Sequence, residues 1–200
     1  KHRFRHTCFV LGVACCALLL AACRFPGTVK PTVKIGLSAP FEGRDRDLGY
    51  EVLYAVRLAV RQRNESGGIA DRYLVELVAL NDFNEAEEAV IQGRKMAVDS
   101  GVMGVLGGWS PAIAEAAAPE YERLGLAFLS PDGNPEAALP TPIQADLSGY
   151  EALSGGVAPG PAAVWAYGAT KRLLDALDAA ARSGGQPDRR SVWQALAASP

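Results

Sequence analysis

The chain has 200 residues, of which 49% are hydrophobic and 21% charged, and its formal net charge at pH 7 is −2. This balance gives no support for a nucleic-acid-binding protein, which would carry an excess of lysine and arginine. All four cysteines fall within the first 23 residues, so the rest of the chain has neither a disulfide framework nor a cysteine-based metal site.

The first 22 residues have the pattern of a secretory signal peptide. Lys1, Arg3 and Arg5 form a basic start, and residues 7–22 are almost wholly apolar or small. This run is shorter than the roughly 20 apolar residues of a membrane-spanning helix, and it ends in small residues as a secretory leader does. We therefore predict a signal peptide over residues 1–22, with a short retained anchor as the alternative.

The leader ends in "LAAC" at residues 20–23, which resembles a bacterial lipobox. In such signals a peptidase cuts before a cysteine that carries a lipid. The pattern predicts that Cys23 is lipidated and anchors the chain to the cell membrane, facing the periplasm or the cell exterior. Residues 23–32 then form a short tether. Cleavage would leave 17 Lys and Arg against 22 Asp and Glu, a net charge near −5 that favours solubility.

From residue 33 onward, short apolar segments alternate with amphipathic ones. The period of two, or a short apolar run between turn residues, predicts strands at 33–38, 73–80, 102–106 and 126–130. Helical periodicity follows each of the first three strands, and Asn84 with Glu87 predicts a capping box at the start of the second helix. Such alternation is typical of a parallel sheet with right-handed crossovers. We expect the strand order 2-1-3-4.

The segment 132–160 breaks this pattern. It is rich in proline, glycine and serine, and we expect it to be irregular and to cross the surface. A long helix is predicted from about Ala162 to Arg182, and a short one within "PDRRSVWQALAAS" (187–199). The fold class that follows is α/β, with a Rossmann-like parallel sheet flanked by helices.

Several stretches in order resemble the leucine/isoleucine/valine-binding class of periplasmic binding proteins. They are "VKIGLSAPFEG" (33–43), "GGIADRYLVELVALND" (67–82), "GVMGVLGGWSPAIAEAAAPEYERLGLAFLSP" (101–131) and "GYEALSGGVAPGPAAVWAYGATKRLLDAL" (149–177). The resemblance implies a type I periplasmic-binding-protein lobe and a receptor lipoprotein of a branched-chain amino-acid ABC transporter. It also implies an amino acid or similar carboxylate as ligand, an ABC permease as partner, and no cofactor.

Members of that family have two lobes hinged around a ligand cleft, whereas this chain resembles only one. The resemblance implies that residues 33–131 supply the βα units of lobe one, 132–160 replace the second lobe, and 161–200 return to pack on lobe one. Gly168 stands where the family usually has an acidic residue, and "SPDGN" (130–134) replaces the usual Ser-Pro-small-Thr pattern. We expect a truncated, weakly binding receptor, with a non-transporting relic or interaction module as the alternative.

The strongest candidate site is the strand–turn–helix junction "GGWSPAI" (107–113). Ser110 is placed as the N-cap and Pro111 as the first helical residue. The free N–H groups of Ala112 and Ile113 and the positive helix end then form a site for a carboxylate. The resemblance implies that Ser110 contacts the ligand directly; a plain helix cap without a ligand is the alternative.

Three further residues are candidates at the carboxyl edge of the sheet, where open α/β sheets bind ligands. Ser130 ends the fourth strand and is predicted to bond the ligand's ammonium or carboxylate, or to be structural only. Phe41 and Trp109 are candidate walls of a side-chain pocket, with packing on their own lobe as the alternative.

The same junction approximates the nucleophile elbow of a serine hydrolase, with Ser110 as nucleophile. A serine nucleophile needs a base, and the only histidines, His2 and His6, lie in the leader. We therefore predict a binding protein and not an enzyme. Asp82 and the "RDRD" run (44–47) are interpreted as solvated loop charges, and no phosphate loop or metal-ligand spacing is present.

Overall fold

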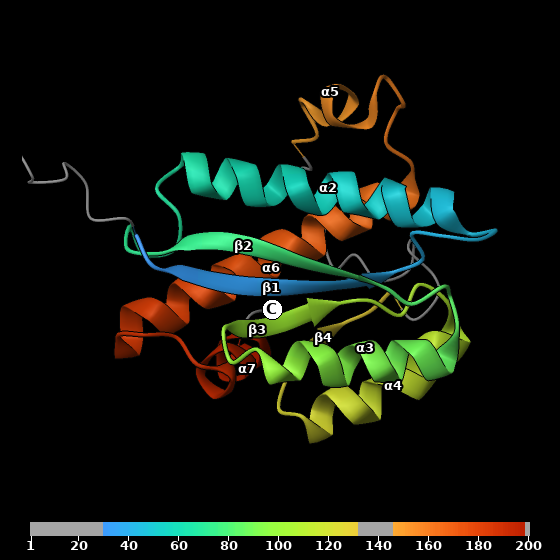
Figure 1. Ribbon diagram of the computed structural model, residues 1–200. Helices are drawn as coiled ribbons and strands as arrows, with labels where there is room; N and C mark the ends of the chain where they lie inside the picture. The colour runs from blue at the N-terminus through green and yellow to red at the C-terminus, as the bar shows by residue number, and fades with distance from the viewer. Residues whose placement is uncertain (1–29, 132–145, 199–200) are drawn as a thin grey trace, which may run out of the picture. The chain divides into compact units, whose positions relative to one another are not determined.

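A four-stranded parallel sheet forms the centre of the described part of the chain (Figure 1). The computed structural model describes residues 30–131 and 146–198. The strands are β1 (Thr32–Ala39), β2 (Leu74–Asn81), β3 (Val102–Leu106) and β4 (Ala127–Leu129). Their order is β2-β1-β3-β4, and every neighbouring pair is parallel, so the predicted fold class and strand order are confirmed.

Helices cover both faces of this sheet, and Figure 1 shows the two layers. Their bounds are α2 (Arg46–Glu65), α3 (Ala86–Val98), α4 (Pro111–Arg123), α5 (Tyr150–Ser154), α6 (Pro161–Gly184) and α7 (Arg189–Ala198). One core lies between the sheet and the apolar faces of α2 and α6, and a second core lies between the sheet and α3 and α4. None of the helices in the described ranges is long and apolar enough to span a membrane.

The central strand β1 shows how the sequence dictates these layers. Its odd-numbered residues from Val33 to Ala39 are apolar and almost fully buried in the core with α2 and α6. Its opposite face carries Gly36, where an added Cβ would lie 2.5 Å from the sulfur of Met96 and 2.8 Å from a methyl group of Val105. Glycine at this position therefore lets α3 approach the sheet closely.

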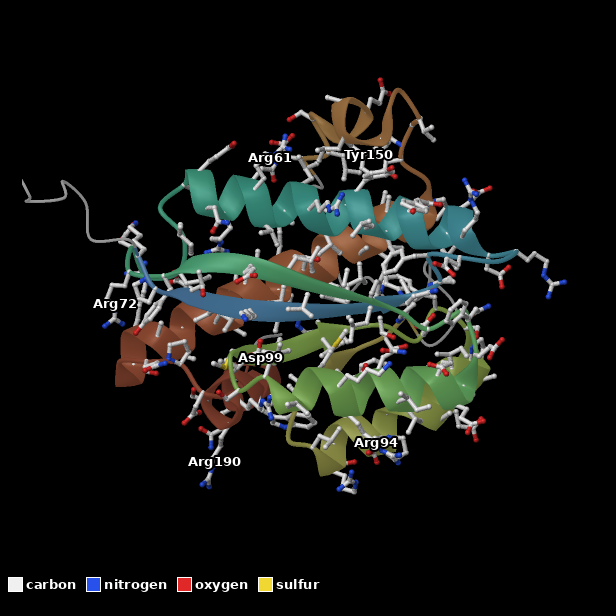
Figure 2. All side chains as sticks on the ribbon, in the orientation of Figure 1. Arg61, Arg72, Arg94, Asp99, Tyr150 and Arg190 are labelled. Carbon is white, nitrogen blue, oxygen red and sulfur yellow. The ribbon has the colours of Figure 1, made fainter. Side chains whose placement is uncertain are left out.

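The structure corrects the sequence analysis at two places in the fold. Within the segment expected to be irregular, Tyr150–Ser154 forms α5, because the buried Tyr150 packs against α2 and donates a hydrogen bond to the carbonyl of Glu51 at 3.1 Å (Figure 2). The capping box is also wrong, since Glu85 is the N-cap of α3 and makes no side-chain capping bond. The predicted signal peptide, Cys23 and most of the tether lie outside the described residues.

Candidate functional site

The junction between β3 and α4 has the backbone that the sequence predicts. Gly108 has φ of 72°, and a Cβ there would lie 2.6 Å from the Ser130 Oγ and 3.0 Å from Ala114, so only glycine fits this turn. The turn places Ser110 at the N-cap of α4 in extended conformation, with Pro111 as the first helical residue. The Ser110 hydroxyl does not cap the helix; it donates a long hydrogen bond of 3.5 Å to the Asn84 Oδ1.

The N-terminus of α4 is unoccupied by any acid of the described chain. The N–H groups of Ala112 and Ile113 have no hydrogen-bond partner among residues 30–131 and 146–198, and the first turn of α4 holds no acidic residue. At α6, in contrast, the Glu51 carboxylate accepts the N–H of Ala163 at 3.0 Å. The chain thus supplies its own carboxylate to the N-terminus of α6, whereas the positive N-terminal end of α4 receives no carboxylate from the described residues.

The structure distinguishes between the two interpretations of Trp109. Its side chain is only 7% exposed, its Nε1 donates to the carbonyl of Ser38 at 2.7 Å, and its ring meets that of Trp165 edge-on at 5.5 Å. These contacts favour packing on its own lobe over a wall of an open pocket.

The other two candidates remain at the carboxyl edge. Ser130 is half-buried and donates its hydroxyl hydrogen to the carbonyl of Gly108 at 2.9 Å, so it ties β4 to the turn before α4. Phe41 is partly buried, and its ring meets the edge of Tyr50 at 6.1 Å. The backbone N–H of Phe41 donates to the Asn81 Oδ1 at 2.8 Å.

The interpretation of Asp82 as a solvated loop charge is wrong. Asp82 is 1% exposed, and its carboxylate accepts hydrogen bonds from the Ser38 hydroxyl at 2.8 Å and from the N–H of Asn84 at 3.0 Å. Burial raises the pKa of Asp82, although these hydrogen bonds oppose the shift. Asp45 of the "RDRD" run also has a structural contact, because its carboxylate accepts a hydrogen bond from the Nδ2 of Asn84 at 2.8 Å.

Sequence reasoning missed the role of the turn between β2 and α3. The side chain of Asn84 bridges the loops after β1 and β3, because it contacts both Asp45 and Ser110. Asn81 accepts, on one oxygen, the N–H groups of Phe41 and of Phe83, the latter at 3.1 Å. The letters "NDFN" indicate a turn, but nothing local in them reveals these contacts to other loops.

In the hydrolase alternative, Ser110 would need a general base as its hydrogen-bond partner. The hydrogen-bond partner of the Ser110 hydroxyl is an amide oxygen, which does not take up a proton at neutral pH. The described residues include no histidine. Ser110 is placed to donate or accept hydrogen bonds.

Surface hollows lie beside α7. Some lie at the edge of the sheet opposite its carboxyl edge, and one lies along β4. One of about 610 Å³ is lined by residues that include Arg189 and Arg190. The Arg189 guanidinium is bound to the carbonyls of Ala97, Asp99 and Val102 and so has a structural role, while the exposed Arg190 extends outward (Figure 2). Neither arginine is close in the fold to the N-terminus of α4.

The sequence of this fold matches the model of a known protein family. The model of a family described as periplasmic binding protein matches residues 32–142, which is more than half of the chain. The chain belongs to the periplasmic binding protein family. The description of this family names a periplasmic location and a binding role. No curated protein matches the sequence significantly.

Solved structures of similar proteins come from several bacteria. A branched-chain amino acid ABC transporter protein from Rhodospirillum rubrum is 27% identical over 61% of this chain and 32% of its own, with a TM-score of 0.48. The substrate-binding protein LivJ from Streptococcus pneumoniae, solved with isoleucine, is 28% identical over 50% of this chain and 28% of its own, with a TM-score of 0.47. The chain thus spans about a third of the length of these relatives.

A substrate-binding periplasmic protein from Ralstonia solanacearum shares the fold over more of the chain. Its identity is 14%, its TM-score is 0.64, and the match covers 82% of this chain and 88% of that one. At this identity the likeness is one of fold alone.

Proposed function

We propose that the chain is a receptor lobe that binds the carboxylate of a small amino acid, such as leucine, isoleucine or valine, at the N-terminus of α4. The observation that carries this proposal is the pair of unpartnered N–H groups of Ala112 and Ile113, next to the Ser110 hydroxyl, at the carboxyl edge of the sheet. Open α/β sheets bind ligands at this edge, and a helix N-terminus favours an anion. LivJ, solved with isoleucine, provides the ligand class.

The neighbouring side chains suit the ammonium group of the same ligand. The hydroxyl of Ser130 donates to the carbonyl of Gly108 and places a hydroxyl oxygen at this edge of the sheet. The amide oxygen of Asn84 contacts the Ser110 hydroxyl, and the carboxylate of Asp45 contacts the amide nitrogen of Asn84, so both add negative potential near Ser110. A zwitterion would therefore find its negative group at the helix end and acceptors for its positive group nearby.

Binding to a single lobe is expected to be weak. A hydrogen bond that faces water contributes only about 0.5–1.5 kcal/mol net. Three such bonds, from the N–H groups of Ala112 and Ile113 and from a Ser110 hydroxyl that turns from Asn84 to the ligand, amount to a few kcal/mol, which corresponds to a dissociation constant of about 1 mM or weaker. A tight amino-acid site requires that nearly all of the ligand be enclosed, and the described residues offer one sheet with its flanking helices.

The domain arrangement in this proposal is one lobe on a membrane anchor. Residues 33–131 form its βα units, the segment 132–160 stands in place of the second lobe, and residues 161–200 complete the helical layer. Lipidated Cys23 would hold the lobe at the membrane, where an ABC permease is the partner. A non-transporting relic or interaction module remains the alternative function.

The test is a titration of the isotope-labelled chain with leucine, followed by NMR. The amide signals of Ala112 and Ile113 should shift in fast exchange, with a dissociation constant of about 1 mM or weaker. Leucinamide, which lacks the carboxylate, should leave both signals in place. Ser110→Ala should weaken leucine binding several-fold, whereas Ser154→Ala, a hydroxyl on α5, should not. Shifts confined to other residues, or equal shifts with leucinamide, would refute the carboxylate site.

A further inference from the structure

The turn between β2 and α3 has an unusual residue in a constrained backbone. The N–H of Glu85 donates to the carbonyl of Asp82 at 2.8 Å, and both central residues have positive φ, 54° for Phe83 and 60° for Asn84. Turns with positive φ at both positions favour Gly, Asn and Asp. Asn84 fits that rule, but a bulky residue such as Phe83 is strained there.

A buried network holds this turn in place despite the strain. The Asn81 side chain accepts the N–H of Phe83, and the Asp82 carboxylate accepts the N–H of Asn84. Asp82 is itself held by the hydroxyl of Ser38, which is 1% exposed. The strained conformation is thus fixed by partners on β1 and β2.

The strain provides no visible packing benefit to the fold. The Phe83 side chain is 43% exposed and belongs to neither apolar core. A second turn with positive φ, at Ala70 and Asp71, closes the bridge between Ile69 and Tyr73 and carries only small residues. Phe83 therefore stands out as an aromatic ring held toward solvent by its backbone.

The turn that carries Phe83 lies beside the proposed ligand site. Asn84, the next residue, contacts Ser110 at the N-cap of α4, and Asn81 binds the backbones of Phe83 and Phe41 through one oxygen. The strained turn, the N-terminus of α4 and the loop after β1 thus meet at one edge of the sheet. Of the aromatic residues there, Trp109 is buried, Phe41 is partly buried and packs on Tyr50, which is 39% exposed, and Phe83 is exposed without a ring partner among the described contacts.

We propose that Phe83 is a specificity-determining residue, whose ring provides the apolar wall for the side chain of the amino acid bound at α4. The inference rests on the proposed function and adds the side-chain contact to it. Strain stored at a functional site and held by surrounding structure is a known arrangement. Here it keeps an apolar surface in place for a ligand that is largely open to water.

The decisive measurement is the ratio of leucine to alanine affinity in the full chain, measured by NMR titration. If the ring covers about 40 Å² of the leucine side chain, Phe83→Ala should weaken leucine binding about fivefold. Alanine binding should change little, so the ratio falls by about the same factor. Trp193→Ala, which removes an aromatic residue of similar exposure (44%) from α7, should leave the ratio unchanged.

A second variant separates this role from a structural one. Phe83→Gly relieves the strained backbone but adds freedom to the unfolded chain. These effects oppose each other, so the melting temperature should stay within a few degrees. The leucine to alanine ratio should nevertheless fall as it does for Phe83→Ala.

The outcomes distinguish the two proposals. If the wild-type chain binds leucine at Ala112 and Ile113 but both variants keep its leucine to alanine ratio, the role of Phe83 is refuted and the proposed function stands. If the wild-type chain binds neither amino acid, the proposed function fails, and the role of Phe83 fails with it. A ratio that falls equally in Trp193→Ala would also overturn the inference.

Discussion

Removing the Glu51 side chain tests how much a carboxylate at a helix N-terminus adds to the free energy of unfolding of this fold. Glu51 on α2 accepts the N–H of Ala163 in the first turn of α6 at 3.0 Å, and a Cβ on Gly160 would lie 2.6 Å from the same oxygen. Loss of a hydrogen bond with a charged acceptor costs about 1.5–3 kcal/mol at most. Loss of the charge–dipole term costs about 0.3–1 kcal/mol more.

Because Glu51 is partly exposed, water replaces some of the lost contact, and we expect the low end of this range. Glu51→Ala should lower the free energy of unfolding by about 1.5–2.5 kcal/mol, which is about 4–8 °C in melting temperature for a domain of this size. Glu51→Gln keeps an acceptor oxygen and should lose only about 0.5–1 kcal/mol, an amount that shrinks in 1 M salt.

The assay is urea denaturation of the variants, monitored by circular dichroism, with Glu122→Ala as the control. Glu122 is exposed near the end of α4, and its removal should change stability by less than about 0.5 kcal/mol. A Glu51→Ala variant as stable as this control would show that a carboxylate at a helix N-terminus gains little here. The same reasoning for a ligand at α4 would then lose its support.

Three other variants test separate parts of the account. Burial raises the pKa of Asp82, so the ionised carboxylate destabilises the fold above that pKa. Asp82→Asn should therefore raise the free energy of unfolding at pH 7. This gain should fall as the pH drops through the raised pKa, as urea denaturation at several pH values would show. Gly36→Ala should destabilise by about 1–3 kcal/mol, because the new methyl meets Met96 and Val105, and an unchanged denaturation midpoint would contradict this packing. Cys23→Ser should leave the precursor uncut and free of lipid label in cells; unchanged processing would remove the predicted lipidation.

The strand order follows from patterns that are local in the sequence. The alternation of Val33, Ile35 and Leu37, and the helices between strands, are enough to predict a parallel sheet. The site was predictable only as far as one junction, where Ser110 and Pro111 mark the start of α4. These features depend on residues within a few positions of one another.

The parts that the sequence analysis missed depend on contacts between distant residues. Asp82 looks like a solvated turn acid, yet β1 and β2 pair in register up to Asn81, which brings Ser38 to its carboxylate. Trp109 and Phe83 are both aromatic loop residues, and only tertiary packing decides that one is buried and the other exposed. The helix α5 has five residues and depends on Tyr150 packing against α2.

The affinity of the chain for leucine decides whether one open lobe forms the binding site. Calorimetry with micromolar protein and leucine should show no binding heat, while the dissociation constant from NMR should be about 1 mM or weaker, with the largest shifts at Ala112 and Ile113. Micromolar binding that is lost in Ser110→Ala would contradict the single open lobe, because it would require a site that encloses the ligand.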